Sequence, residues 1–104
     1  MFIIGDFNYD LEDDLSGKDI ASVVDMRDCW LEAHGGATGE RGFTFDAVLN
    51  PTALITSKTG KRKRYDRILL QSQLWRSASA WLFGTDPSVV VDDKTRLCPS
   101  DHYG

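Results

Sequence analysis

The sequence predicts an α/β chain of the α+β kind, in which a mixed, mostly antiparallel sheet carries helices on one face. Three observations lead to this prediction. A strand pattern comes first, helical patterns follow, and mostly strand patterns fill the rest of the chain. The apolar runs are short and include β-branched residues, as strands do. The helical content is too small for the crossovers that a doubly wound parallel sheet requires.

The N-terminal part is predicted to form one strand and two helices. Residues 2–4 are a short apolar run ending at Gly5-Asp6, which indicates a buried strand whose end turns outward. Helices are expected over residues 18–23 and 26–34, and Gly35-Gly36 is expected to stop the second one.

The C-terminal part is predicted to be mostly strand. Residues 42–46 alternate apolar and polar side chains, which indicates a strand or a strand end, and residues 50–60 are expected to form a loop. Residues 68–70 indicate a central strand. The alternation at the start of residues 75–83 predicts an amphipathic strand, and residues 89–91 predict an edge strand or an ordered loop.

Length and composition are those of one small globular domain or of a part of a larger one. The chain has 104 residues, of which 41% are hydrophobic and 27% are charged. Its formal net charge is −4, so any nucleic-acid binding has to come from a local basic patch. No stretch approaches the length of a transmembrane helix, and we expect no membrane partner.

The cysteines and the N-terminal residues favour an intracellular location. Cys29 and Cys98 have neither the spacing of a zinc motif nor the number of a disulfide framework, so we expect two buried thiols in a reducing compartment. The apolar run at the start stops at Gly5-Asp6, which does not fit a signal peptide. The cytoplasm or the nucleus is the expected location.

A carboxylate and an amide follow the first predicted strand. Asp6 and Asn8 are two residues apart, so both side chains point to the same side if the chain stays extended. The amide can donate to a phosphoryl oxygen, and the carboxylate can orient a water or a metal-bound water. A plain turn is the alternative, because Gly-Asp and Asn are common turn residues.

A second carboxylate begins the central strand, and a histidine lies in the last predicted loop. Asp66 and Arg67 form a surface ion pair in one interpretation. In the other, Asp66 accepts a hydrogen bond from His102 and sets the tautomer of that imidazole. A solvated loop histidine is the alternative for His102.

The basic run at residues 61–64 directly precedes this strand. It is either a solvated loop, a device that steers a polyanionic substrate, or a nuclear localisation signal. Arg64, the last residue of the run, is a candidate for substrate binding because it stands two positions before Asp66.

Three motifs stand in a fixed order: Gly5-Asp6-Phe7-Asn8, Asp66-Arg67-Ile68-Leu69 and Ser100-Asp101-His102. Together they resemble the C-terminal half of the active-site signature of the endonuclease/exonuclease/phosphatase superfamily of Mg²⁺-dependent phosphoesterases. Within it, the context of the last two motifs is most similar to the tyrosyl-DNA phosphodiesterases, which remove peptide adducts from 5′ DNA ends. Inositol polyphosphate 5-phosphatases share these two motifs, but Arg64-Tyr65 replaces their Trp-Cys.

Members of that superfamily fold as a four-layered α/β sandwich of two sheets with helices outside. The resemblance implies that residues 1–104 are the C-terminal portion of such a domain. It also implies a partner, the N-terminal half, which carries a metal-binding glutamate. Without that glutamate the portion alone is expected to bind metal weakly and to lose activity.

The resemblance also implies a role for each matching residue. Asp6 would orient the attacking water or assist the leaving group and would contribute to the metal site, while Asn8 would bind the phosphate. Asp66 would hold His102, and His102 would stabilise charge in the transition state. Asp101 would help to hold the metal or its water. The substrate wall would consist of Thr44, Phe45 and Asp46, with Arg64 as a further substrate contact.

The implied function is Mg²⁺-dependent hydrolysis of phosphodiester bonds at nucleic-acid ends or protein–DNA adducts, with Mn²⁺ as an alternative metal. One alternative is a non-catalytic half-domain that binds nucleic acid or a partner chain through open sheet edges. A further alternative keeps the catalysis and changes the substrate to an inositol phosphate or RNA, because similarity of fold does not define the substrate.

Overall fold

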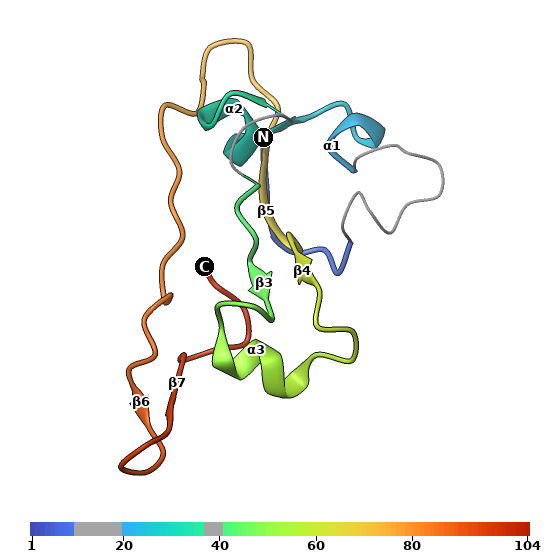
Figure 1. Cartoon of the computed structure of the whole chain (residues 1–104). Helices are drawn as coiled ribbons and strands as arrows, with labels where there is room; N and C mark the ends of the chain where they lie inside the picture. Colours follow the sequence, from blue (N-terminus) through green and yellow to red (C-terminus); the bar gives the residue numbers. More distant parts are fainter. Residues whose placement is uncertain (10–19, 37–40) are drawn as a thin grey trace. The chain divides into compact units, whose positions relative to one another are not determined.

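The protein is an α+β structure with short antiparallel sheets and few helices (Figure 1). The structure, a computed structural model, describes residues 1–9, 20–36 and 41–104. The chain divides into two compact units. The first comprises Met1–Gly42 with Arg64–Trp81, and the second comprises Phe43–Lys63 with Leu82–Gly104. The expected α+β class and the antiparallel pairing are therefore confirmed.

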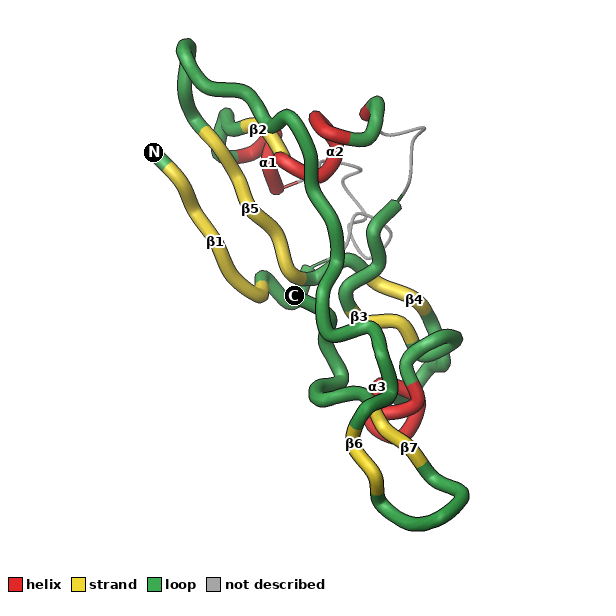
Figure 2. Tube along the Cα trace, turned by 90° about the vertical axis from the view of Figure 1, so that its left-hand side faces the viewer, coloured by secondary structure: helices red, strands yellow, loops and turns green. Residues whose placement is uncertain are grey.

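A three-stranded antiparallel sheet forms the centre of the first unit. Its strand order is β1-β5-β2, with β1 at Phe2–Asp6, β5 at Asp66–Leu70 and β2 at Arg27–Asp28. Figure 2 shows β1 and β5 running side by side, with Ile4 opposite Ile68 in the register. The prediction of a central strand at residues 68–70 is confirmed.

The core of the first unit lies on one face of this sheet. Leu69 is fully buried against Ala21 and Met26, and Phe7 and Ile20 pack around them. Helix α1, Ile20–Val23, provides Ala21, and helix α2, Cys29–Ala33, also contacts β5. The N-terminal part of the first predicted helix, residues 18–19, lies outside the described residues.

Strand β1 is exposed, and the prediction of a buried first strand is wrong. Ile4 is 69% exposed, and Phe2 beside it on the same face is 60% exposed. The reason is the position of β1, which pairs with β5 on one side and is the edge strand among the described strands. An apolar run predicts a strand correctly but does not predict what covers it.

The second predicted helix is shorter than expected. Residues 26–34 form β2 first, and α2 starts only at Cys29 because the Asp28 carboxylate accepts hydrogen bonds from the Trp30 and Leu31 N–H groups. The helix ends at Ala33, just before Gly35, which has a φ of 83°. The glycine stop is therefore confirmed.

Two short strand pairs and a helix form the second unit. Strand β3, Phe45–Asp46, pairs with β4, Arg62–Lys63, and β6, Val89–Val90, pairs with β7, Arg96–Leu97. Helix α3 spans Pro51–Thr56, so the expected loop over residues 50–60 is wrong in its first half. Asn50 caps this helix, and proline suits its first position.

The predicted strand at residues 75–83 is absent, and this prediction is wrong. At the start of this segment, side chains form hydrogen bonds with backbone groups that a partner strand would otherwise bind. Arg27 donates to the carbonyl oxygens of Ser72 and Trp75 at 2.8 and 2.6 Å, and Glu32 accepts from the Ser77 N–H at 2.8 Å. Alternation of side chains alone therefore gave a false strand.

Within the described ranges, no helix has both the length and the apolar character needed to cross a membrane.

Candidate functional site

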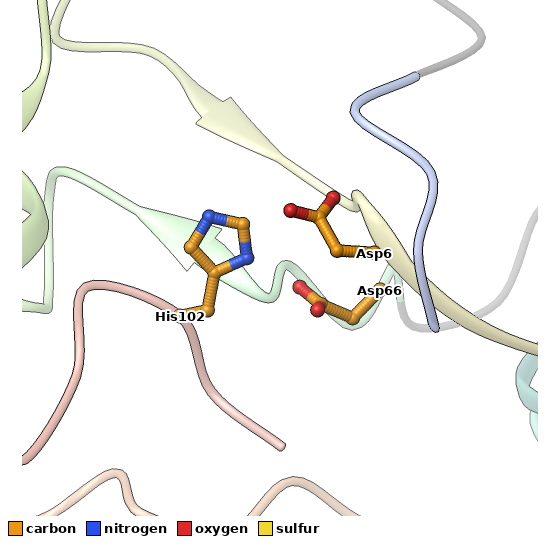
Figure 3. A group of neighbouring side chains, drawn as sticks. All are labelled: Asp6, Asp66 and His102. Carbon is orange, nitrogen blue, oxygen red and sulfur yellow. The ribbon is translucent and has the colours of Figure 1, made fainter. Parts of the chain in front are cut away.

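Asp6 and Asp66 lie opposite each other where β1 ends and β5 begins. The flanking pairs exchange backbone hydrogen bonds, since the Phe7 N–H donates to the Tyr65 carbonyl and Met1 pairs with Gln71. Alternation along an antiparallel pair then makes Asp6 and Asp66 a non-hydrogen-bonded pair, in which the side chains approach most closely. Figure 3 shows the two carboxylates side by side, and one oxygen of each lies within 4.8 Å of the other.

Two carboxylates in this position repel each other. Like charges directly opposite on neighbouring strands cost on the order of 0.2–1 kcal/mol. Asp6 is exposed and Asp66 is half-buried, so solvent screens the pair only in part. A hard cation between the two would remove this repulsion, and carboxylate oxygens are the ligands that Mg²⁺ prefers.

Asn8 does not continue the extended strand. Its φ is 49°, in the left-handed region that asparagine tolerates better than most residues. Its backbone N–H donates to Asp6 Oδ1 at 2.8 Å, so the chain turns back on the Asp6 carboxylate. The argument from an extended chain is therefore wrong for Asn8, although the two residues are still neighbours at the strand end.

A buried ionic cluster lies on the helix-covered side of the first unit. Arg64 donates to Asp28 Oδ2 at 2.6 Å, and Arg67 approaches the same oxygen at 3.5 Å. The side chain of Arg67 is 1% exposed and that of Asp28 is 2% exposed. A surface pair of Arg67 with Asp66, one of the two interpretations of these residues, is therefore wrong. Arg64 has Asp28 as a structural partner, and its substrate role stays a prediction.

Most side chains of the basic run 61–64 form contacts within the protein or are buried. Arg62 forms a bidentate ion pair with Asp46, at 3.0 and 2.7 Å, and its guanidinium lies 4.5 Å from the centre of the Phe43 ring. Lys63 and Arg64 are buried. A solvated loop is therefore the wrong interpretation for residues 62–64, and substrate steering stays a prediction.

In the second unit, helix α3 holds the segment that carries Asp101 and His102. Asn50 Nδ2 donates to the Ser100 carbonyl at 3.0 Å, and Thr52 Oγ1 donates to the Cys98 carbonyl at 2.8 Å. Thr56 Oγ1 donates to Asp101 Oδ2 at 3.1 Å. Three side chains from one short helix and its cap thus reach this segment.

The other side of the same segment rests on β3. The Tyr103 N–H donates to the Thr44 carbonyl at 2.7 Å, and Phe45 and His102 form an isolated antiparallel bridge. The Phe45 ring meets the His102 ring edge-on, with centroids 5.4 Å apart. The predicted wall residue Phe45 therefore contacts the predicted catalytic histidine.

Thr44 and Asp46 are buried parts of this support. Thr44 is 4% exposed and Asp46 is 2% exposed. Asp46 Oδ1 also accepts the N–H groups of Val48 and Leu49, so this carboxylate is committed to the local turn and to Arg62. The contacts of Asp46 support a structural role for this residue.

The Tyr103 side chain is buried, and Cys98 and the Asp46–Arg62 ion pair lie near its hydroxyl. Burial raises the pKa of Tyr103 to about 12, and the neighbouring Cys98 and Asp46 act in the same direction. Both cysteines are buried free thiols, as expected. Burial also raises the pKa of the Cys29 thiol, and the nearby Asp28 carboxylate adds to this effect.

The structure thus brings Asp6 together with Asp66, and Phe45 together with His102, each pair within one unit. The hydrogen bond expected between Asp66 and His102 would join the two units, and it stays a prediction, as does the metal-binding role of Asp101.

Sequence reasoning missed Asn50 and Thr52, which hold the segment that carries His102. It also missed Asp28, which caps α2 and binds Arg64 and Arg67. The pair Asn50-Pro51 is a typical start of a helix, and this signal could have revealed both α3 and its cap.

In comparisons with known proteins, no family model, no curated sequence and no solved structure matches the chain.

Proposed function

We propose that the chain belongs to the catalytic domain of a Mg²⁺-dependent phosphodiesterase that cleaves phosphodiester bonds at nucleic-acid ends or protein–DNA adducts. The observation that carries the proposal is the Asp6–Asp66 pair, two carboxylates within 4.8 Å at the ends of adjacent strands. The order of the three motifs and their resemblance to the endonuclease/exonuclease/phosphatase superfamily supply the reaction class.

The donor chemistry fits a hard cation. Asp6 and Asp66 offer carboxylate oxygens, and Asp101 offers another in the second unit. Mg²⁺ keeps several of its waters, so few protein ligands are enough to hold it. When bound, such an ion neutralises charge on phosphoryl oxygens and lowers the pKa of a water.

The residues of the chain have separate tasks in this proposal. Asp6 orients the attacking water, and its own orientation is held by the Asn8 N–H. The Asn8 amide binds a phosphoryl oxygen. Asp66 accepts a hydrogen bond from His102 and fixes its tautomer, and His102 donates to the oxygen on which negative charge grows. Asp101 supports the metal or its water.

The proposal includes a larger fold, the four-layered sandwich of two sheets. The face of the β1–β5 pair that carries Phe2, Ile4 and Ile68 supports it, because these apolar side chains are 60%, 69% and 45% exposed. Two sheets that pack face to face bury such side chains between them. The N-terminal half implied by the resemblance would supply the second sheet.

The test is hydrolysis of a 5′-tyrosyl oligonucleotide and of a nitrophenyl phosphodiester by the chain combined with the N-terminal half that the proposal includes, with Mg²⁺ and with EDTA. Asp6→Ala and His102→Ala should each lower the rate by about 10²-fold or more. Asp93→Asn is the matched control, because Asp93 lies in the turn between β6 and β7 and has no role in the proposal. Equal rates in all variants, or turnover in EDTA, would contradict the proposal.

A second candidate function is pairing of chains through the open edge of β1. Alternation along the β1–β5 pair directs the backbone groups of Phe2, Ile4 and Asp6 away from β5. The occupant that suits this edge is a second copy. A two-fold axis at Ile3 would place Phe2 opposite the second copy's Ile4, an apolar pair with no charge between the strands.

Sedimentation equilibrium tests this second candidate function, because it measures the association of chains. It predicts a dimer that Ile4→Lys converts to a monomer, because a charge on an edge strand opposes pairing. Val90→Lys is the control, since Val90 lies on β6 in the second unit and is also exposed. A wild-type monomer over the whole concentration range would exclude pairing through β1.

A further inference from the structure

The geometry points to Asn50 as a positioning residue that holds the Asp101–His102 segment in place for the reaction. The inference rests on the proposed function for its meaning, but it concerns a residue outside the motifs that suggested that function. Asn50 is 1% exposed and stands just before helix α3.

Both ends of the Asn50 amide are used. Its Oδ1 accepts the N–H groups of Thr52 and Ala53, at 2.9 and 3.2 Å, which caps the helix. Its Nδ2 donates to the Ser100 carbonyl at 3.0 Å, two residues before His102. One buried side chain therefore joins the start of α3 to the segment that carries the imidazole.

The place of Asn50 is itself well defined. Its backbone N–H donates to the Asp46 carbonyl at 2.8 Å, and the Asp46 carboxylate is held by Arg62. Asp46 is 2% exposed and lies on β3, whose other residue, Phe45, bridges to His102. Asn50 is thus bonded to β3, the strand that also contacts His102 through Phe45.

The segment between the two supports is short. Asn50 holds the carbonyl of Ser100, and the Thr44 carbonyl holds the N–H of Tyr103. Only Asp101 and His102 lie between these anchors. Loss of either anchor would let the His102 backbone sample conformations that turn the imidazole away, because loop residues without such bonds are free to move.

Asn50→Asp separates the two functions of the amide. Aspartate caps helices as well as asparagine does, so the bonds to Thr52 and Ala53 are kept. It has no N–H group to donate, so the bond to the Ser100 carbonyl is lost. Thr52→Val removes the hydrogen bond from the Thr52 hydroxyl to the Cys98 carbonyl, so it loosens the same segment without changing Asn50.

The main readout is amide hydrogen exchange followed by NMR, which requires no turnover. Asn50→Asp should speed exchange at Tyr103 by about five- to tenfold, the effect of one lost hydrogen bond. The Leu54 N–H, which donates to the Asn50 carbonyl within α3, should exchange at its wild-type rate. Ser57→Ala, which removes a hydroxyl at the other end of α3, is the control and should leave Tyr103 unchanged.

A second readout applies to the active enzyme. In the phosphodiesterase assay Asn50→Asp should lower kcat with little change in KM, because the substrate contacts remain while the histidine is misplaced. Tyr103 exchange within twofold of wild type in both Asn50→Asp and Thr52→Val would overturn the inference. Faster exchange in a chain that shows no hydrolysis even when combined with the N-terminal half would keep the positioning role and remove the proposed function, so the two failures are distinguishable.

Discussion

The carboxylates and the histidine of the candidate site are positioned in different ways. Asp6 and Asp66 face each other because β1 and β5 pair in a regular register. His102 lies in a segment with little regular structure, and the side chains of Asn50 and Thr52 hold the backbone that precedes it. Backbone pairing tolerates many side-chain changes, whereas a segment held by individual side chains depends on each of them.

This difference indicates which substitution should destabilise each unit most. In the first unit the residue whose loss should cost most stability is not one of the two paired aspartates but the buried Asp28, which binds Arg64 and Arg67. In the second unit the corresponding residues lie beside the histidine itself, at Tyr103 and the helix cap. The following predictions, ordered by expected effect, test this contrast.

Asp28→Ala should have the largest effect on the first unit. It leaves two buried guanidinium groups without their carboxylate, and removal of one member of a buried ion pair costs about 3–5 kcal/mol. Urea unfolding measures the change in free energy of unfolding. The control is Glu32→Ala, since Glu32 pairs with Arg27 and with the largely exposed Arg76 and should cost less. Equal losses in both variants would mean that the buried cluster does not hold this unit together.

High pH should destabilise the second unit through Tyr103. Its pKa is about 12 in the folded chain, and an unfolded tyrosine titrates near pH 10. Because the folded pKa is the higher one, the contribution is complete below about pH 10 and is lost as the pH rises towards 12. Two pKa units correspond to at most about 3 kcal/mol.

Comparison with Tyr103→Phe isolates this contribution. The difference in free energy of unfolding between wild type and variant should change between pH 10 and pH 12 and be constant below that window. The phenolate absorbance should include one transition near pH 12 that is missing in Tyr103→Phe. A difference independent of pH would mean that burial beside Cys98 and Asp46 does not raise the pKa of the Tyr103 hydroxyl.

Asp6→Asn should have the smallest effect, and in EDTA the effect is a gain. Replacing one carboxylate removes the repulsion from Asp66, which stabilises the first unit by up to about 1 kcal/mol. With Mg²⁺ the wild type should gain stability and the variant should gain less, since a ligand of the cation is missing. Thermal unfolding with and without Mg²⁺ measures both, and destabilisation in EDTA would show that the two carboxylates do not repel.

The sequence predicted the parts of this picture that depend on local patterns. Residues 68–70 read as a central strand because an apolar run of that length is typical of one, and β5 is central. The exposure of Ile4 was not predictable, because burial depends on what packs against β1 rather than on its own residues. The false strand at residues 75–83 has a similar cause, since the side chains of Arg27 and Glu32 bind the Trp75 carbonyl and the Ser77 N–H at its start.

The motifs named candidate residues, but they did not name the side chains that hold them. Motif order pointed to Asp6, Asp66 and His102, of which the structure brings Asp6 and Asp66 together, and their roles stay predictions. Nothing in the motifs points to Asn50, which is distant in sequence from Ser100 and acts through a backbone carbonyl that any residue has. Partners of this kind become visible only when the chain is folded.

The central claim is that one divalent cation binds at the strand-borne carboxylates Asp6 and Asp66, with the imidazole of His102 close to it. Mn²⁺ titration followed by NMR tests it, because the paramagnetic ion broadens the resonances closest to it. The account predicts that the backbone amides of Asp6 and Asp66 and the imidazole of His102 broaden together at the lowest Mn²⁺ concentrations, and that excess Mg²⁺ restores them. A His102 imidazole that stays sharp while the two aspartates broaden would contradict it.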